Sequence, residues 1–307
     1  MPIHITRAVR ESAYAQGGVV SRRQLLAAGM TRWQVKAHLN AGRWKAHGRQ
    51  TIAIHTGELD AAAMRWFGVF EAGPRSAVDG VSALEAAGLT GWSSDSVRVS
   101  VPRGAPAVRR KGLMVRQTRR LRTEDVIRAG VPRTRPEIAA VRAALWALSD
   151  RQAATVLAMT VQQRLATAEA IGAALLEVRR HKRLKFLHRV ILDLIGGSQS
   201  MGELDFARMC RRRGLPAPDR QSIRRGPVGR YYLDAHWKAY HLVVEIDGIH
   251  HLGATAVVGD ALRQNDLTLD ADSVLRIPLL GPRVAEAEFM HQVREGLVNG
   301  GWRHQAA

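Results

Sequence analysis

The run from His241 to Asp247 places two acids inside an otherwise apolar strand. Its letters, HLVVEID, are typical of a central strand that is buried on both faces. An ionised carboxylate is costly there unless a cation or hydrogen bonds compensate it. The chain therefore has to fold so that Glu245 and Asp247 meet a compensating group, which restricts this region more than any other feature.

A second strand over residues 229–235 is expected just before this one, joined to it by a tight turn near residues 237–240. With a four-residue turn, Asp234 would lie opposite Val243, one diagonal step from Glu245. Side chains alternate between the two faces of a strand, so Asp247 shares the face of Glu245. The hairpin predicts that three carboxylates converge on one patch.

Two kinds of partner could compensate these acids. Mg²⁺ or Mn²⁺ takes carboxylate oxygens together with water and leaves positions open for phosphate. Structural ion pairs with nearby arginines would do the same without any chemistry. The spacing alone leaves both alternatives open.

The charge of the chain points to a polyanionic partner. Its 46 Lys and Arg residues against 27 Asp and Glu give a net charge of +19, which favours nucleic acid. No amphipathic helix with a Trp or Phe face argues for lipid, so we expect DNA as partner and no membrane association. Cys210 is the only cysteine, which excludes an internal disulfide and a Cys-rich zinc site. The amino terminus lacks an apolar signal region, so a cytoplasmic location is expected.

Residues 1–57 have the pattern of a winged helix-turn-helix. Ser21 and Thr31 are suitable N-caps for two helices, and glycines follow where helices should end. The expected helices cover residues 7–16, 22–28 and 32–40, and the expected hairpin strands cover 44–47 and 51–54.

The third of these helices is the candidate recognition helix. Its long polar side chains, which could reach base edges or phosphates, belong to Arg32, Gln34, Lys36 and His38. The alternative is a solvated helix face, or a three-helix module that contacts protein.

Residues 58–135 form a basic middle region. We expect helices over 59–70 and 82–87 and a strand over 96–101. Twelve basic residues lie between Arg98 and Arg135, against only Glu124 and Asp125. This density could line a phosphate-binding surface, or it could guard a sheet edge. The candidate phosphate contacts are Arg109, Arg110, Lys111, Arg119 and Arg120.

Ala- and Leu-rich segments follow over residues 136–197 and predict a connector of four helices, over 137–148, 150–158, 167–178 and 183–195. A glycine pair at 196–197 breaks this pattern and marks the start of a final domain, residues 198–307. Its first helix, over 202–213, carries Glu203 in the first turn. The helix dipole alone favours an acid there.

The carboxyl-terminal motifs resemble an uncharacterised bacterial family related to very-short-patch-repair endonucleases, within the PD-(D/E)XK nuclease-like group. The resemblance covers roughly residues 198–280. It is carried by Ser198-x-x-x-x-Glu203, Leu233-Asp234, Val244-Glu245-Ile246-Asp247-Gly248-x-x-His251, Asp260-x-x-Arg263-x-Asn265 and Val274-Leu275-Arg276.

That resemblance implies roles for the acids. Asp234 and Glu245 would ligate Mg²⁺ or Mn²⁺, with Glu203 supporting from the helix. Asp247 stands where the larger group usually carries a lysine, which orients the attacking water or stabilises charge.

Another residue would then have to take the part of that lysine. His251 is the first candidate, with His250, Lys238 and Gln264 behind it. Arg263 would stabilise the negative charge that develops on the phosphate.

The amino-terminal 150 residues resemble the AbiEi-type antitoxin family, in which a winged-helix domain precedes a basic domain. Together the resemblances predict an α+β multidomain chain that ends in a restriction-endonuclease-like α/β domain. The expected function is metal-dependent hydrolysis of DNA phosphodiesters, in defence or repair, with a toxin or repair protein as a further partner. A DNA-binding regulator that has lost the chemistry is the first alternative, and a scaffold for a protein partner is the second.

Overall fold

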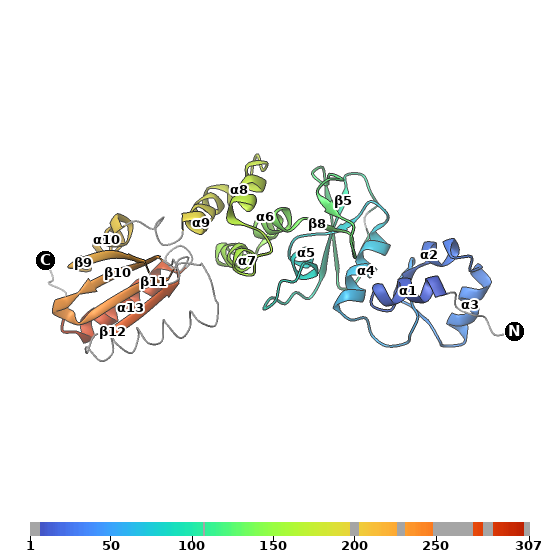
Figure 1. Ribbon diagram of the computed structural model, residues 1–307, viewed down its shortest axis with the longest axis horizontal. Coiled ribbons are helices and arrows are strands. Elements are labelled where there is room, and N and C mark those ends of the chain that lie inside the picture. The colour runs from blue at the N-terminus through green and yellow to red at the C-terminus, as the bar shows by residue number, and fades with distance from the viewer. Residues whose placement is uncertain are drawn as a thin grey trace. The chain divides into compact units, whose positions relative to one another are not determined.

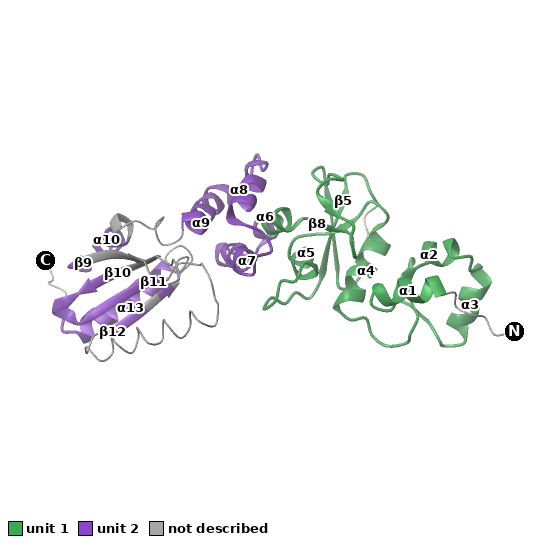
Figure 2. Cartoon of the chain, in the orientation of Figure 1, with its two compact units in different colours: residues 1–143 green, residues 144–307 purple. Residues whose placement is uncertain are grey.

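The computed structural model describes residues 7–106, 108–196, 203–225, 231–247, 273–278 and 285–303. Within these ranges the side chains of 203–205, 220–225, 231–234, 247, 276 and 278 are not described. The chain forms two compact units, residues 1–143 and residues 144–307 (Figures 1 and 2). No helix in the described ranges is both long and apolar enough to cross a membrane.

The first unit begins with the helices and hairpin that the sequence predicted. They are α1 (Arg7–Ala15), β1 (Val19–Ser21), α2 (Arg22–Ala27), α3 (Arg32–Asn40), β2 (Lys45–Ala46) and β3 (Thr51–Ala53). Ser21 and Thr31 cap α2 and α3 through reciprocal capping boxes with Gln24 and Gln34. The short strand β1 was not predicted, and it pairs with β3 on the side away from β2.

A small sheet forms the rest of this unit. Its elements are α4 (Ala61–Ala72), β4 (Ala77–Val78), α5 (Val81–Ala86), β5 (Val97–Pro102), β6 (Leu113–Thr118), β7 (Val126–Ile127) and β8 (Arg133–Thr134). The strand order is β6-β5-β4-β8-β7, so β6 is an edge strand.

A buried carboxylate ties this sheet together. Asp79 accepts hydrogen bonds from the hydroxyls of Ser100 at 2.5 Å and Thr134 at 2.8 Å, and it pairs with Arg142 at 2.6 Å. Because every partner is a donor, the charge of this acid is satisfied internally. Asp79 is therefore a structural acid.

Four helices occupy the stretch where four were expected. They are α6 (Pro136–Trp146), α7 (Asp150–Gln162), α8 (Ala168–Leu176) and α9 (Leu184–Gly196). The division between the two compact units falls inside α6, between residues 143 and 144. In the second unit, Arg183 donates to Asp150 at 2.8 Å and to the carbonyl of Ala147 at 2.5 Å, which joins the start of α7 to the start of α9.

The second unit ends in a mixed sheet with two helices. The elements are α10 (Glu203–Arg212), β9 (Arg220–Arg225), β10 (Tyr231–Trp237), the 3-10 turn η2 (Lys238–Tyr240), β11 (Leu242–Asp247), β12 (Ser273–Pro278) and α13 (Glu286–Asn299). The strand order is β12-β11-β10-β9, with β11 and β12 parallel and the other pairs antiparallel. Helices and mixed sheets along one chain make it α+β, as the sequence predicted.

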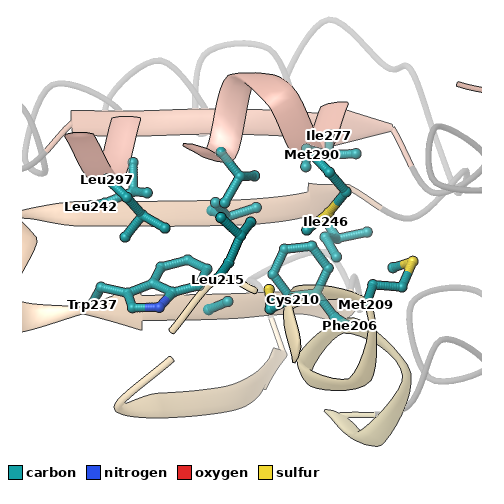
Figure 3. Packing of buried hydrophobic residues seen from close by; sticks show 13 residues of the cluster. Phe206, Met209, Cys210, Leu215, Trp237, Leu242, Ile246, Ile277, Met290 and Leu297 are labelled. Atoms are coloured by element: carbon teal, nitrogen blue, oxygen red, sulfur yellow. The ribbon is translucent and has the colours of Figure 1, made fainter. Parts of the chain in front are cut away.

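Both helices pack on the same face of this sheet. Figure 3 shows the buried cluster, in which Phe206 of α10 and Met290 of α13 meet Trp237 and Ile246 of the strands. Phe206 and Trp237 contact edge to face, with ring centroids 6.3 Å apart. Since this face takes the even-numbered residues of β11, the odd-numbered positions belong to the opposite face.

Candidate functional site

The strand register brings two acids directly opposite each other. Asp234 of β10 pairs with Glu245 of β11, so the expected pairing of Asp234 with Val243 was wrong. The reversal uses residues 238–241 and keeps position 237 in the strand.

Two local contacts explain the change of register. Trp237 is buried in the core cluster and donates its indole N–H to the carbonyl of Pro216 at 3.0 Å, which holds it in β10. His241 then adopts the left-handed conformation, with φ of 48°, and closes the turn. The turn therefore lies one residue later than the sequence suggested, and the acids are closer than expected.

The Asp234–Glu245 pair is part of a row of register positions that runs across all four strands; we call it the carboxylate row. Ser222 of β9 pairs with Asp234, and Arg276 of β12 pairs with Glu245. Neighbouring positions in register share a face of the sheet, and position 247 lies two residues farther along the same face. The sheet thus aligns a hydroxyl residue, two acids and a cation, with a third acid one step along β11.

Glu245 is the member of this row whose side chain is described. It is 4% exposed and lies beside buried Val243 and Val244. A carboxylate so deep in a sheet needs a positive partner or several donors. The register offers Arg276 next to it, so the ion-pair alternative has a specific candidate.

The donor set also fits a hard divalent cation, because three carboxylate positions lie within two residues of one another on one face. Among the described side chains, no group of three His, Cys, Asp or Glu residues is arranged to hold a metal. The side chains of Asp234 and Asp247 are outside that description. The register places the three acids on one face and leaves both the metal and the ion-pair alternatives open.

The remaining candidates of this site are placed only in part. Glu203 is the first residue of α10, and its side chain lies outside the description. The candidates to replace the lysine, His251 with His250 and Gln264 behind it, lie outside the described residues, as does Arg263. Lys238 begins the exposed turn after β10, and its N–H donates to Asp219 at 2.7 Å.

The candidate recognition helix α3 presents only part of the expected surface. Arg32 and Lys36 are exposed. The Gln34 side-chain oxygen accepts from the N–H of Thr31 at 2.7 Å, so it serves the capping box.

His38 was misplaced by the sequence analysis. It is 3% exposed, stacks on Trp44 with ring centroids 4.1 Å apart, and accepts a hydrogen bond from Arg43 at 3.1 Å. Burial, and secondly the positive charge of Arg43, lower the pKa of His38 from its ordinary value. His38 belongs to the core and not to a DNA-contacting face.

A residue that was not predicted, the tryptophan Trp33, is exposed on α3 instead of His38. Trp33 is 78% exposed, and the Lys36 ammonium lies 5.7 Å from its ring centroid. No role was predicted for Trp33 from the sequence, although an aromatic side chain between basic ones on a polar helix face was a usable signal. Arg32, Trp33 and Lys36 form what we call the α3 patch.

The basic residues of the middle region flank an edge strand. Arg109, Arg110 and Lys111 precede β6, and Arg119 and Arg120 follow it, all five exposed. Arg110 also approaches the buried Glu71 carboxylate at 3.8 Å. The position at the sheet edge fits both alternatives raised by the sequence, a phosphate-binding surface and a guarded edge.

Comparison with known proteins gives little further guidance. No protein-family model matches the chain, and no curated protein matches it. Among solved structures, the RV2827C protein from Mycobacterium tuberculosis aligns with 60% of this chain and 76% of its own, at 15% identity and a TM-score of 0.38. A similarity at that level assigns neither fold nor function.

Proposed function

We propose that this protein is a cytoplasmic, metal-dependent DNA endonuclease, directed to DNA by a winged helix in residues 7–53. The observation that carries the proposal is the pairing of Asp234 with Glu245 in a largely apolar strand pair, with Asp247 on the same face. The net charge of +19 supports DNA as the substrate.

In this proposal two acids of the row and three residues outside it carry the chemistry. Asp234 and Glu245 hold Mg²⁺ or Mn²⁺, with Glu203 supporting from α10. When bound, the metal lowers the pKa of a water molecule and polarises the phosphate. His251 substitutes for the lysine that Asp247 replaces, and Arg263 stabilises the charge that develops on the phosphate.

The α3 patch supports the proposal that the winged helix directs the protein to DNA. Two cations and an exposed aromatic ring lie on the helix that follows the turn, where a helix-turn-helix contacts base edges. Its position in an element order of helix, strand, helix, helix and hairpin fits a winged helix. The same patch favours the second candidate function, a DNA-binding regulator or antitoxin without cleavage.

A plasmid assay separates the two functions. Wild type, Glu245→Gln and Asp234→Asn are incubated with supercoiled plasmid, with Mg²⁺, with Mn²⁺ and with chelator. Glu288→Gln, the same change on the exposed face of α13, is the matched control. We expect nicking or linearisation by wild type and control, loss of activity with chelator, and at least a hundredfold loss in both site variants.

Two results would change the assignment. Cleavage that survives Glu245→Gln would show that the carboxylate row is not the active site. Tight binding without cleavage by wild type would favour the regulator.

A further inference from the structure

A groove of about 700 Å³ lies within the first unit, whereas the carboxylate row belongs to the second. Its walls come from α2 and the β2–β3 turn on one side, and from α4, the end of β5 and the loop after it on the other. This volume is in the range of small-molecule sites.

One wall of the groove is aromatic. Trp66 and Phe70 are one helical turn apart on α4, and both are half-buried. Their ring centroids are 5.4 Å apart with planes tilted by 35°. Such a ring surface can take a planar aromatic ligand by stacking.

Three arginines from separate segments also line the groove. Arg23 lies on α2, Arg75 follows α4, and Arg128 follows β7, and all three are exposed. Within the described parts of the chain, none of them forms an ion pair or a side-chain hydrogen bond. Their charge is available to an anion.

Glu71, the acidic residue in the lining, does not offset the charge of the three arginines. Both oxygens of Glu71 accept hydrogen bonds from the β2–β3 turn, from the N–H groups of Arg49 at 3.0 Å, Gln50 at 2.8 Å and Thr51 at 3.0 Å. The side chain of Glu71 lines the groove but is only 2% exposed, and it is one acid against three arginines. The groove therefore keeps a net positive lining.

We propose that this groove binds a nucleotide, with the base against Trp66 and Phe70 and the phosphate among Arg23, Arg75 and Arg128. A guanidinium fork matches a phosphate in charge and geometry. A free nucleotide and the unpaired end of a DNA strand share this chemistry. The site lies in the first unit and takes no part in the proposed cleavage.

Binding is tested with the full-length chain in the presence of chelator, which prevents metal-dependent cleavage. The probes for calorimetry and tryptophan fluorescence are dAMP, dTMP, ATP, a four-nucleotide single strand, inorganic phosphate, deoxyadenosine and a glutamate-rich peptide. The variants are Arg75→Ala and Arg128→Ala. Arg103→Ala, an exposed arginine of the same region outside the lining, is the matched control.

We expect nucleotide or single-strand binding that each variant weakens roughly tenfold, as loss of a charge-assisted hydrogen bond predicts. Trp66→Phe should retain binding and remove most of the fluorescence change. Binding of free nucleotides identifies a soluble ligand, and binding of the single strand alone identifies a strand end.

The proposal is overturned if no nucleotide or strand binds, or if binding is unchanged in both arginine variants. It is equally overturned if deoxyadenosine or the peptide binds as tightly as dAMP. Because plasmid cleavage is not a readout here, failure of the nuclease assignment leaves this test intact.

Discussion

The carboxylate of Glu71 accepts hydrogen bonds from both the backbone N–H and the hydroxyl of Thr51, at 3.0 and 2.9 Å. With the bonds from Arg49 and Gln50, this one side chain on α4 holds the whole β2–β3 turn. A Cβ added to Gly48 would lie 2.4 Å from the same carboxylate, so the turn also needs glycine there. The contact fixes the turn of the proposed wing against the middle region.

Glu71→Gln should therefore destabilise the first unit. The amide NH₂ would face N–H donors, and leaving a buried donor unsatisfied costs about 1–3 kcal/mol. We expect a loss of about 2 kcal/mol in the free energy of unfolding, measured by urea denaturation followed by tryptophan fluorescence. Glu58→Gln removes an exposed acid paired with Lys45 and should leave the stability nearly unchanged. Equal effects of the two changes would contradict the structural role of Glu71.

Trp33 should contribute to DNA affinity without contributing to stability. Its ring is largely in solvent, so Trp33→Ala should leave the thermal transition unchanged. We expect about tenfold weaker DNA binding in a fluorescence anisotropy assay, consistent with the value of one stacking contact, and partial recovery with Trp33→Phe. Tyr14→Ala removes an aromatic that is 86% exposed on α1 and serves as the control. If Trp33→Ala binds DNA as tightly as the Tyr14→Ala control and the wild type do, α3 is not the recognition helix.

The buried His38 makes the stability of the first unit depend on pH. Its pKa is lowered in the folded state, so the unfolded chain takes up the proton first as the pH falls. Stability is complete above the ordinary value of 6.5 and is lost as the pH drops from there toward the folded pKa. His38→Phe keeps a ring against Trp44 and should reduce this dependence between pH 7.5 and 5 in urea titrations, with the remainder owed to His47, whose pKa burial also lowers. A slope that is identical in the variant would exclude His38 as its source.

Cys210 should report the integrity of the second unit. Burial raises the pKa of its thiol to about 12, so almost no thiolate exists at neutral pH. A disulfide reagent such as DTNB should react only when the core around Phe206 and Trp237 opens. We expect the reaction rate to follow the unfolding transition in urea, and rapid labelling of native protein would contradict this packing.

Local signals predicted much of this fold from the sequence. Ser21 and Thr31 placed α2 and α3 because an N-cap hydroxyl acts on backbone donors within its own turn. His38 could also have been placed, because it follows Val35 by three positions and so shares the buried side of the helix.

Tertiary contacts were not predictable in the same way. The burial of Trp237 moved the turn by one residue and set Asp234 opposite Glu245, and no neighbouring residue signals this. The link from Glu71 to Thr51 spans 20 positions, and the groove beside it combines segments that only the fold brings together. Register and long-range polar contacts therefore had to come from the structure.

Glu245 serves either a metal site or a structural ion pair, depending on its partner. The effect of metal on the stability of the protein distinguishes the two. If Asp234 and Glu245 bind a cation, Mn²⁺ at a hundred times its Kd should stabilise the protein by about 2.7 kcal/mol. Glu245→Gln should then remove this gain and raise the stability without metal, because it relieves repulsion between facing acids. If Arg276 is the sole partner, Mn²⁺ should have no effect, and Glu245→Gln should lower the stability, because the ion pair of a buried carboxylate is lost. Thermal unfolding with chelator and with Mn²⁺, using Glu288→Gln as control, gives opposite signs for the two cases.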